Sequence, residues 1–376
     1  MGQDITDRTE APERTRAFTK ALLRDVMALE RMLEEGCFES GIRRIGAEQE
    51  MFLVNRAWRP NSAAMDVLAE VEGPFTTELA LYNLEANAEP LRLEGSCFRR
   101  MEARLNELVS HGREIAAPMG AEIALIGILP TLSKSDVTLE NITPKARYHA
   151  LNDAFAKARG GEPYKLRIQG SDELYTEHHS VMLESCNTSF QVHLQVDPDD
   201  FATVYNVAQL VTAPAMAAAV NSPVLFGKLL WEETRIALFQ QSIDTRRGSV
   251  HMRDVSPRVR FGEEWIADGL MDLVLEDVTR FRVLISREVD EDPIAMLDAG
   301  EVPSLHALSL HNGTVYRWNR PCWGVRDGIA HLRIECRVLP SGPTIVDEVA
   351  NMAFWIGLVL GGVEEYGDIR SRIDFA

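Results

Sequence analysis

The chain has 376 residues, of which 45% are hydrophobic and 26% are charged, as in ordinary folded proteins that bury a large core. Its formal net charge is −18 and its pI is about 5.0, which argues against a nucleic-acid groove or a patch for an anionic membrane. Nucleotides stay compatible with this charge, because divalent metal ions can hold phosphates in an acidic site. We therefore expect small-molecule partners, with no nucleic acid and no membrane, and we leave a homo-oligomer open.

The scattered cysteines and the polar N-terminal segment indicate a reducing, cytoplasmic setting. The five cysteines form no Cys-x-x-Cys or Cys/His cluster, so structural zinc is not expected. Residues 1–18 are polar and acidic, unlike a signal or transit peptide. The longest apolar runs, residues 208–220 and 352–362, are too short or too interrupted for a membrane span.

Helical and strand patterns mix along the chain without strict alternation. In the N-terminal half, the patterns predict a helix at about 12–36, strands at 44–55 and 76–90, a helix at 96–120 capped by Ser96, a strand at 121–130 and a helix at 146–161. Further on, they predict a strand at 189–196, helices at 199–220 and 231–243, strands near 314–319 and 330–339 and a helix at 344–360, with residues 243–290 unassigned.

This order of elements predicts an α+β fold with a curved, largely antiparallel sheet and helices on one of its faces. No linker, low-complexity tract or repeat divides the chain. We therefore expect a single domain over residues 1–376, with its core at about 40–362.

Four of the predicted strands carry one apolar face and one face of carboxylates, imidazoles, amides and guanidinium groups. Side chains alternate along a strand, so Glu48 and Glu50 share a face of the first one. The polar faces of the other three strands are Asn83, Glu85, Asn87 and Glu89; Gln191, His193 and Gln195; and His331, Arg333, Glu335 and Arg337.

These polar faces have two interpretations. One is an antiparallel sheet with a solvated face, on which lysine, serine and threonine are expected. The four faces contain no lysine and are rich in groups that bind metals and phosphate. That composition favours a polar pocket in which clustered glutamates hold Mg²⁺ or Mn²⁺ and neighbouring arginines hold phosphate.

At these residues the chain resembles the glutamate–cysteine ligases and related ATP-dependent carboxylate–amine ligases. The motifs, in chain order, are Gly46-x-Glu48-x-Glu50, the pair Glu78 and Glu85, Arg147-Tyr148, His193, Asn221-Ser222-Pro223, Glu232 to Arg235, Arg320, and RIECRVLPSGPT at 333–344. The last is similar to the family's E-x-R-x-L-D-x-x-P-T signature, although Pro340 stands where Asp is usual. Each motif is weak alone, whereas their ordered combination over residues 40–362 is specific.

The resemblance implies a glutamine synthetase-like catalytic fold, related to that of guanidino kinases, which binds ATP and Mg²⁺ or Mn²⁺. The implied metal ligands are Glu48, Glu50, Glu78, Glu85 and Glu335. Glu78 is the least regular of them, because in a straight strand it would face away from Glu85. Replacing a repelling carboxylate, as in Glu48→Gln or Glu335→Gln, should abolish metal-dependent ATP turnover and spare the fold.

The resemblance also implies roles for residues that are not metal ligands. Arg337 would contact the γ-phosphate or the phosphorylated intermediate and, with Glu335, would be catalytic. His193 and Gln191 would lie beside the nucleotide or a metal. The residues implied for the carboxylates of an amino-acid substrate are Arg235, Arg320 and Arg147. Ion pairing is the alternative for Arg235 and Arg320.

The implied activity is an ATP-dependent ligase that joins a carboxylate, first of all the γ-carboxylate of glutamate, to an amine such as cysteine through an acyl phosphate, as in glutathione biosynthesis. No Walker A loop or G-x-S-x-G elbow competes with this interpretation. Two alternatives stay open. One is a non-catalytic nucleotide or amino-acid sensor with the same pocket. The other is a guanidino-kinase-like phosphotransferase, although no reactive-cysteine loop is found.

Overall fold

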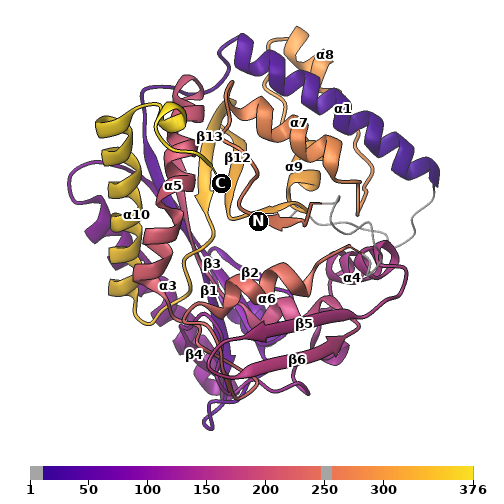
Figure 1. The fold of residues 1–376 in the computed structure, drawn as a ribbon, viewed down its shortest axis with the longest axis vertical. Coiled ribbons are helices and arrows are strands. Elements are labelled where there is room, and N and C mark those ends of the chain that lie inside the picture. The colour runs from indigo at the N-terminus through magenta and orange to yellow at the C-terminus, as the bar shows by residue number, and fades with distance from the viewer. Residues whose placement is uncertain (1–11, 247–255, 376) are drawn as a thin grey trace.

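The computed structural model describes residues 12–246 and 256–375, and Figure 1 shows how the elements are arranged. The α-helices are α1 (Pro12–Glu34), α2 (Ala64–Glu70), α3 (Cys97–Ala116), α4 (Ala146–Ala158), α5 (Phe201–Ala219), α6 (Thr234–Ser242), α7 (Leu270–Arg280), α8 (Pro293–Asp298), α9 (His306–Asn312) and α10 (Ile345–Tyr366). The strands are β1 (Arg44–Val54), β2 (Phe75–Thr77), β3 (Asn83–Arg92), β4 (Glu122–Ala124), β5 (Tyr164–Gln169), β6 (Glu173–His178), β7 (Phe190–Gln195), β8 (Val224–Leu225), β9 (Lys228–Leu229), β10 (Val259–Arg260), β11 (Tyr316–Arg317), β12 (Asn319–Arg326) and β13 (Ile329–Cys336).

One sheet holds the polar strand faces together. Its strand order is β12–β13–β7–β1–β3–β2, with β4 also paired to β1, and all of these pairs are antiparallel. The sheet curls into a half barrel. The predicted curved, largely antiparallel sheet is therefore confirmed. The single-domain assignment stays a prediction, although one sheet does take strands from residue 44 to residue 336.

The strand register brings the polar faces onto one surface, because directly opposed residues of paired strands share a face. The opposed pairs are Glu335 with His193, Gln191 with Glu48, and Glu50 with Glu85. A register shift between Ile45 and Ala47 interrupts the ladder between β1 and β3, before it reaches the two glutamates of β1. Side chains from four strands thus meet on the concave face of the half barrel.

Helices α3, α5 and α10 pack on the other face of the sheet, where the alternate apolar side chains of the strands lie (Figure 1). Trp355 of α10 is fully buried there. Helices are not confined to that face as predicted, since Arg147 and Tyr148 of α4, and Ile243 just after α6, line a cavity over the polar face. This second cover shields the polar face from bulk water.

Two predicted strands are shorter than expected. The predicted strand 76–90 is divided into β2 and β3, because the chain turns at 80–82 and Asn83 N donates to Ala80 O at 3.0 Å. In the predicted strand 121–130 only β4 is extended and paired. Beyond it Gly127 lies against Arg235, Pro340 and the Asn221 carbonyl, where a Cβ would meet atoms at 2.9–3.1 Å. A buried irregular crossing takes the place of a strand there.

Other differences are local. Ser96 precedes α3, but its side chain makes no capping hydrogen bond. The β5–β6 hairpin was not predicted, although its side chains alternate regularly between buried and exposed. The unassigned segment 243–290 contains β10 and α7, while residues 247–255 lie outside the described part.

Helix α10 is, within the described residues, the one helix long and apolar enough to cross a membrane by length and composition. It packs against α5 and α3 and contacts β7, with Met352, Trp355 and Val359 buried. These contacts are those of a core helix.

Candidate active site

The first of two carboxylate clusters joins three strands of the sheet. Glu48 (β1), His193 (β7) and Glu335 (β13) each offer one ligand atom, and the three atoms lie within 4.8 Å of one another. His193 Nε2 is 3.0 Å from Glu48 Oε1 and 3.7 Å from Glu335 Oε1. All three side chains are buried, and no atom of the described residues forms a hydrogen bond with His193 Nδ1. His193, expected beside the nucleotide or a metal, is thus placed as a ligand-type residue.

The second cluster joins β1, the residue that follows β2, and β3. Ligand atoms of Glu50, Glu78 and Glu85 also lie within 4.8 Å of one another. Glu78 follows the last residue of β2, so it leaves the strand geometry that would have turned it away from Glu85. Glu50 accepts from Ser189 N and from Gln191 Nε2, both at 2.6 Å, and Glu85 accepts from Asn87 Nδ2 at 2.6 Å.

The two clusters differ in electrostatic balance. In the second, burial and then neighbouring carboxylate charge raise the pKa of Glu85 to about 7 and the pKa of Glu78 well above its usual range. In the first, burial opposes ionisation, but the guanidinium groups of Arg320 and Arg337 hold the pKa of Glu335 well below its usual range. Among the described residues, no salt bridge compensates Glu78 or Glu85, whereas Glu335 has two guanidinium groups paired with it.

Both clusters suit a hard divalent cation. Their donors are carboxylate oxygens with a single imidazole, which is a set that Mg²⁺ or Mn²⁺ accepts. A cation would supply the missing charge among Glu50, Glu78 and Glu85, and His193 would complete the set around Glu48 and Glu335. The five predicted metal ligands are thus brought together, divided between two adjacent clusters.

Arg337 lies between the clusters. Its Nη1 donates to Glu335 Oε2 at 3.0 Å and to Gln191 Oε1 at 2.5 Å, and Gln191 in turn donates to Glu50. None of the described residues accepts a hydrogen bond from Arg337 Nη2. The guanidinium is therefore held by one edge on the sheet and has donors left for an anion.

Arg320 and Arg235 are engaged with protein groups. Arg320 donates from Nε and Nη2 to both oxygens of Glu335, at 2.7 and 3.0 Å. Arg235 is buried and donates to Glu233 Oε1 at 3.0 Å and to Val338 O at 2.9 Å. These pairings let Arg320 and Arg235 position Glu335 and the end of β13. Arg320 also lines a cavity over the polar face, so contact of these arginines with a substrate carboxylate stays a prediction.

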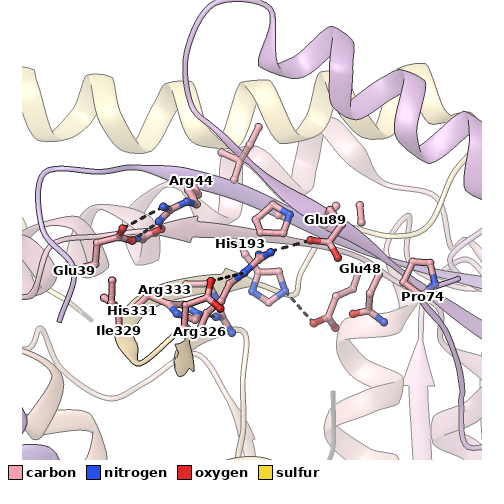
Figure 2. A pocket seen from close by; sticks show the side chains of 18 residues that line it. Glu39, Arg44, Glu48, Pro74, Glu89, His193, Arg326, Ile329, His331 and Arg333 are labelled. Carbon is pink, nitrogen blue, oxygen red and sulfur yellow. Dashed lines mark hydrogen bonds and ion pairs between the residues drawn. The ribbon is translucent and has the colours of Figure 1, made fainter. Parts of the chain in front are cut away.

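Three cavities adjoin the clusters, and we call them the larger cavity, the middle cavity and the side chamber. The larger cavity, of about 580 Å³, is lined by polar residues, among them Glu48, His193, Arg44, Arg326 and Arg333, and by the apolar Pro74 and Ile329 (Figure 2). The figure shows the hydrogen bond from His193 to Glu48 at its border. The middle cavity, of about 230 Å³, is also lined by Glu48. Glu48 therefore borders both cavities.

The middle cavity contains the second cluster and Arg337, together with Lys145, Arg147 and Tyr148 from the start of α4. Among the described residues, no hydrogen bond or ion pair engages the Arg147 guanidinium, and its Nε is buried. Tyr148 ties α4 to the sheet by donating to Thr77 O at 2.7 Å. Of the three arginines predicted for the substrate, Arg147 is the one whose guanidinium is free to meet a carboxylate.

Glu184 was not predicted. It lies in a short 3₁₀ turn, Val181–Cys186, and lines both the middle cavity and a side chamber of about 20 Å³. The available signal was one carboxylate inside the apolar run VMLESC. Lys145 was also missed, although it stands two residues before Arg147.

The sequence matches the model of glutamate-cysteine ligase family 2 over residues 44–368, so the chain belongs to that family. The match includes every residue of the two clusters, Arg147, Glu184 and Arg337. The family is one of ATP-dependent ligases. No curated protein matches the chain.

Solved structures resemble the chain only distantly. A bifunctional glutathione synthetase from Pasteurella multocida matches with 10% identity and a TM-score of 0.41, covering 89% of this chain and 40% of that one. The structures titled "Apo GmaS without ligand" and "GmaS/ADP complex-Conformation 1" each match with 12% identity, covering 93% of this chain and 75% of theirs, with TM-scores of 0.30 and 0.27. This chain thus spans less than half the length of the bifunctional enzyme.

Proposed function

We propose that the protein is an ATP- and Mg²⁺-dependent ligase that joins a carboxylate, first of all the γ-carboxylate of glutamate, to an amine through an acyl phosphate. The supporting observation is the placement of Arg337 between two carboxylate clusters on one shielded sheet face. Phosphoryl transfer to a carboxylate needs positive charge on both sides of the transferred group and protection from water. We likewise propose that the half-barrel sheet is the catalytic sheet of a glutamine synthetase-like fold.

We assign the nucleotide and the amino acid to different cavities. The larger cavity has room for a nucleoside, with the phosphates directed toward Glu48 and His193. The middle cavity has Arg147 and Lys145 for the α-carboxylate of an amino acid whose distal carboxylate reaches Arg337. The acyl acceptor and the phosphoryl donor then meet beside Glu48, which borders both cavities.

Bound Mg²⁺ or Mn²⁺ would neutralise the triphosphate. The carboxylate oxygen attacks the γ-phosphorus, the bond from phosphorus to the bridging oxygen breaks, and ADP leaves. Arg337 stabilises the charge on the transferred group by donating from its free edge. The amine nitrogen then attacks the acyl carbon, the bond to the phosphate oxygen breaks, and phosphate and one proton leave with the amide formed.

A panel assay tests the proposal. Purified protein with Mg²⁺ and ATP is given each of several amino acids, with and without an amine, and ADP, phosphate and product mass are followed. We expect ADP formation that requires an acidic amino acid and yields an amide mass with the amine. Nucleotide binding without turnover over the whole panel would instead indicate a sensor.

A further inference from the structure

Within the 3₁₀ turn Val181–Cys186, Glu184 is the residue that is not fully buried. The other five side chains of Val181–Cys186 are buried, and they fix the turn against the core, with Ser180 Oγ accepting from Met182 N at 3.3 Å. Glu184 is the residue of this turn that reaches the cavities. Its orientation is thus set by neighbours that take no part in the chemistry.

The carboxylate of Glu184 has no counter-charge of its own. Among the described residues no hydrogen bond or salt bridge engages it, and the nearby Arg337 already donates to Glu335 and Gln191. Burial, followed by the charge of Glu50, raises the pKa of Glu184 to about 8. A cationic ligand group beside Glu184 would favour its ionised form and form an ion pair with it.

The location matches one step of the reaction. Glu184 lines the wall shared by the middle cavity and the side chamber, and Arg337 and Glu50 line the same two spaces. The acyl phosphate would form beside Arg337. Because Glu184 lines the same two spaces as Arg337, it borders the space in which a nucleophile would reach the acyl carbon.

We propose that Glu184 binds the ammonium group of the amine substrate and accepts its extra proton, which leaves the neutral amine to attack the acyl carbon, and so makes the second half-reaction selective for amines that are cationic in solution. This inference rests on the proposed ligase function. Arg147 and Lys145 bind the carboxylate of the anionic substrate, and Glu184 binds the cationic amine. The charges of these residues therefore determine which substrate binds at each position. Glu184 is accordingly a specificity-determining residue, distinct from both carboxylate clusters.

The test compares a charged and an uncharged nucleophile in Glu184→Gln, which keeps the side-chain shape. The nucleophiles are ammonium, methylammonium or cysteine, whichever the parent uses, and hydroxylamine, which is largely uncharged at neutral pH. We expect the KM for the charged amine to rise by about 10-fold or more, as for loss of a charged hydrogen bond. The KM values for ATP and hydroxylamine should stay within about 2-fold. Glu140→Gln, an exposed carboxylate outside these cavities, is the matched control.

The outcomes are distinguishable. Equal losses for both nucleophiles, an unchanged KM for the charged amine, or a shifted Mg²⁺ dependence would overturn the role of Glu184 while leaving the ligase intact. Absence of amide and hydroxamate with the parent protein would overturn the ligase proposal, and this inference with it.

Discussion

Individual carboxylates of the site have opposite effects on the stability of the protein, because the charges around them differ. Glu335 is buried between two guanidinium groups, while Glu85 is buried beside other carboxylates. The expectation that removing any of these carboxylates spares the fold needs correction for Glu335. Removing one partner of a buried ion pair leaves the other uncompensated.

Glu335→Gln should therefore abolish Mg²⁺-dependent ATP turnover and also lower the free energy of unfolding by about 3 kcal/mol. The glutamine amide would keep one acceptor oxygen, but Arg320 and Arg337 would both lose the negative charge that compensates them. Chemical denaturation and ADP release measure the two effects. Full stability in this variant would contradict the ion-pair arrangement.

Glu85→Gln should also abolish turnover, but it should stabilise the metal-free protein. Burial and neighbouring charge raise the pKa of Glu85 from 4.5 to about 7, and each unit corresponds to roughly 1.4 kcal/mol. Above neutral pH we expect a gain of about 1–3 kcal/mol in the absence of divalent cations. A loss of stability would show that the second cluster is not strained by its charge.

The same shift gives a pH dependence. A carboxyl group with a raised folded-state pKa stabilises the protein below its unfolded pKa, and this stabilisation is lost as pH rises through the folded pKa. For Glu85 the window runs from 4.5 to about 7. Without metal, melting temperature should fall across that window by less in Glu85→Gln than in the parent. Mg²⁺ should restore the parent at the upper end. Identical pH profiles for the two proteins would contradict this account.

Arg337→Lys should lower kcat by about 10- to 100-fold with a smaller change in the KM for ATP, because Lys lacks the planar pair of donors. Arg43→Lys, at an exposed position, is the control. If only thermal stability changes, the ion pair with Glu335 is the whole role of Arg337.

At the scale of elements, the turn after β13 links the sheet to α10 and carries the family signature. Gly342 has a φ of +78°, and its N–H donates to Glu348 Oε1 at 2.6 Å. A Cβ at this position would lie 2.1 Å from the Leu125 carbonyl oxygen. The backbone therefore approaches too closely for any side chain.

Gly342→Ala should cost about 3 kcal/mol or more, from the left-handed conformation and the clash together. Gly328→Ala is the matched control, since Gly328 has a φ of +77° in the β12–β13 turn and a Cβ added there would meet no atom of the other described residues within 4 Å, its chain neighbours aside. It should cost only about 1–2 kcal/mol. Equal unfolding free energies for the two variants would show that the contact with Leu125 is easily relieved.

Strand periodicity predicted the polar face well, because alternation within Glu48–Glu50 and Glu335–Arg337 is a local property. It did not predict which arginine meets a substrate, since Arg235 and Arg320 find partners far along the chain or on the next strand. Nor did it locate Glu184, whose segment is neither strand nor regular helix. Contacts between distant segments decide the roles of the two arginines, and an irregular turn decides the position of Glu184.

At the scale of the whole molecule, one half barrel brings residues from positions 48 to 337 onto a shielded surface with cavities on both sides. Arg337 lines the middle cavity, and Glu48 lines both that cavity and the larger one. We propose that the two substrates meet beside these residues and react through an acyl phosphate.

Oxygen transfer tests that claim most directly. The acidic amino acid is labelled with oxygen-18 in its distal carboxylate and turned over with ATP, Mg²⁺ and the amine, and the released phosphate is analysed by mass spectrometry. The account predicts one labelled oxygen in the phosphate for each amide formed. Amide formation with unlabelled phosphate would contradict the acyl phosphate, and unlabelled phosphate without amide would show simple ATP hydrolysis.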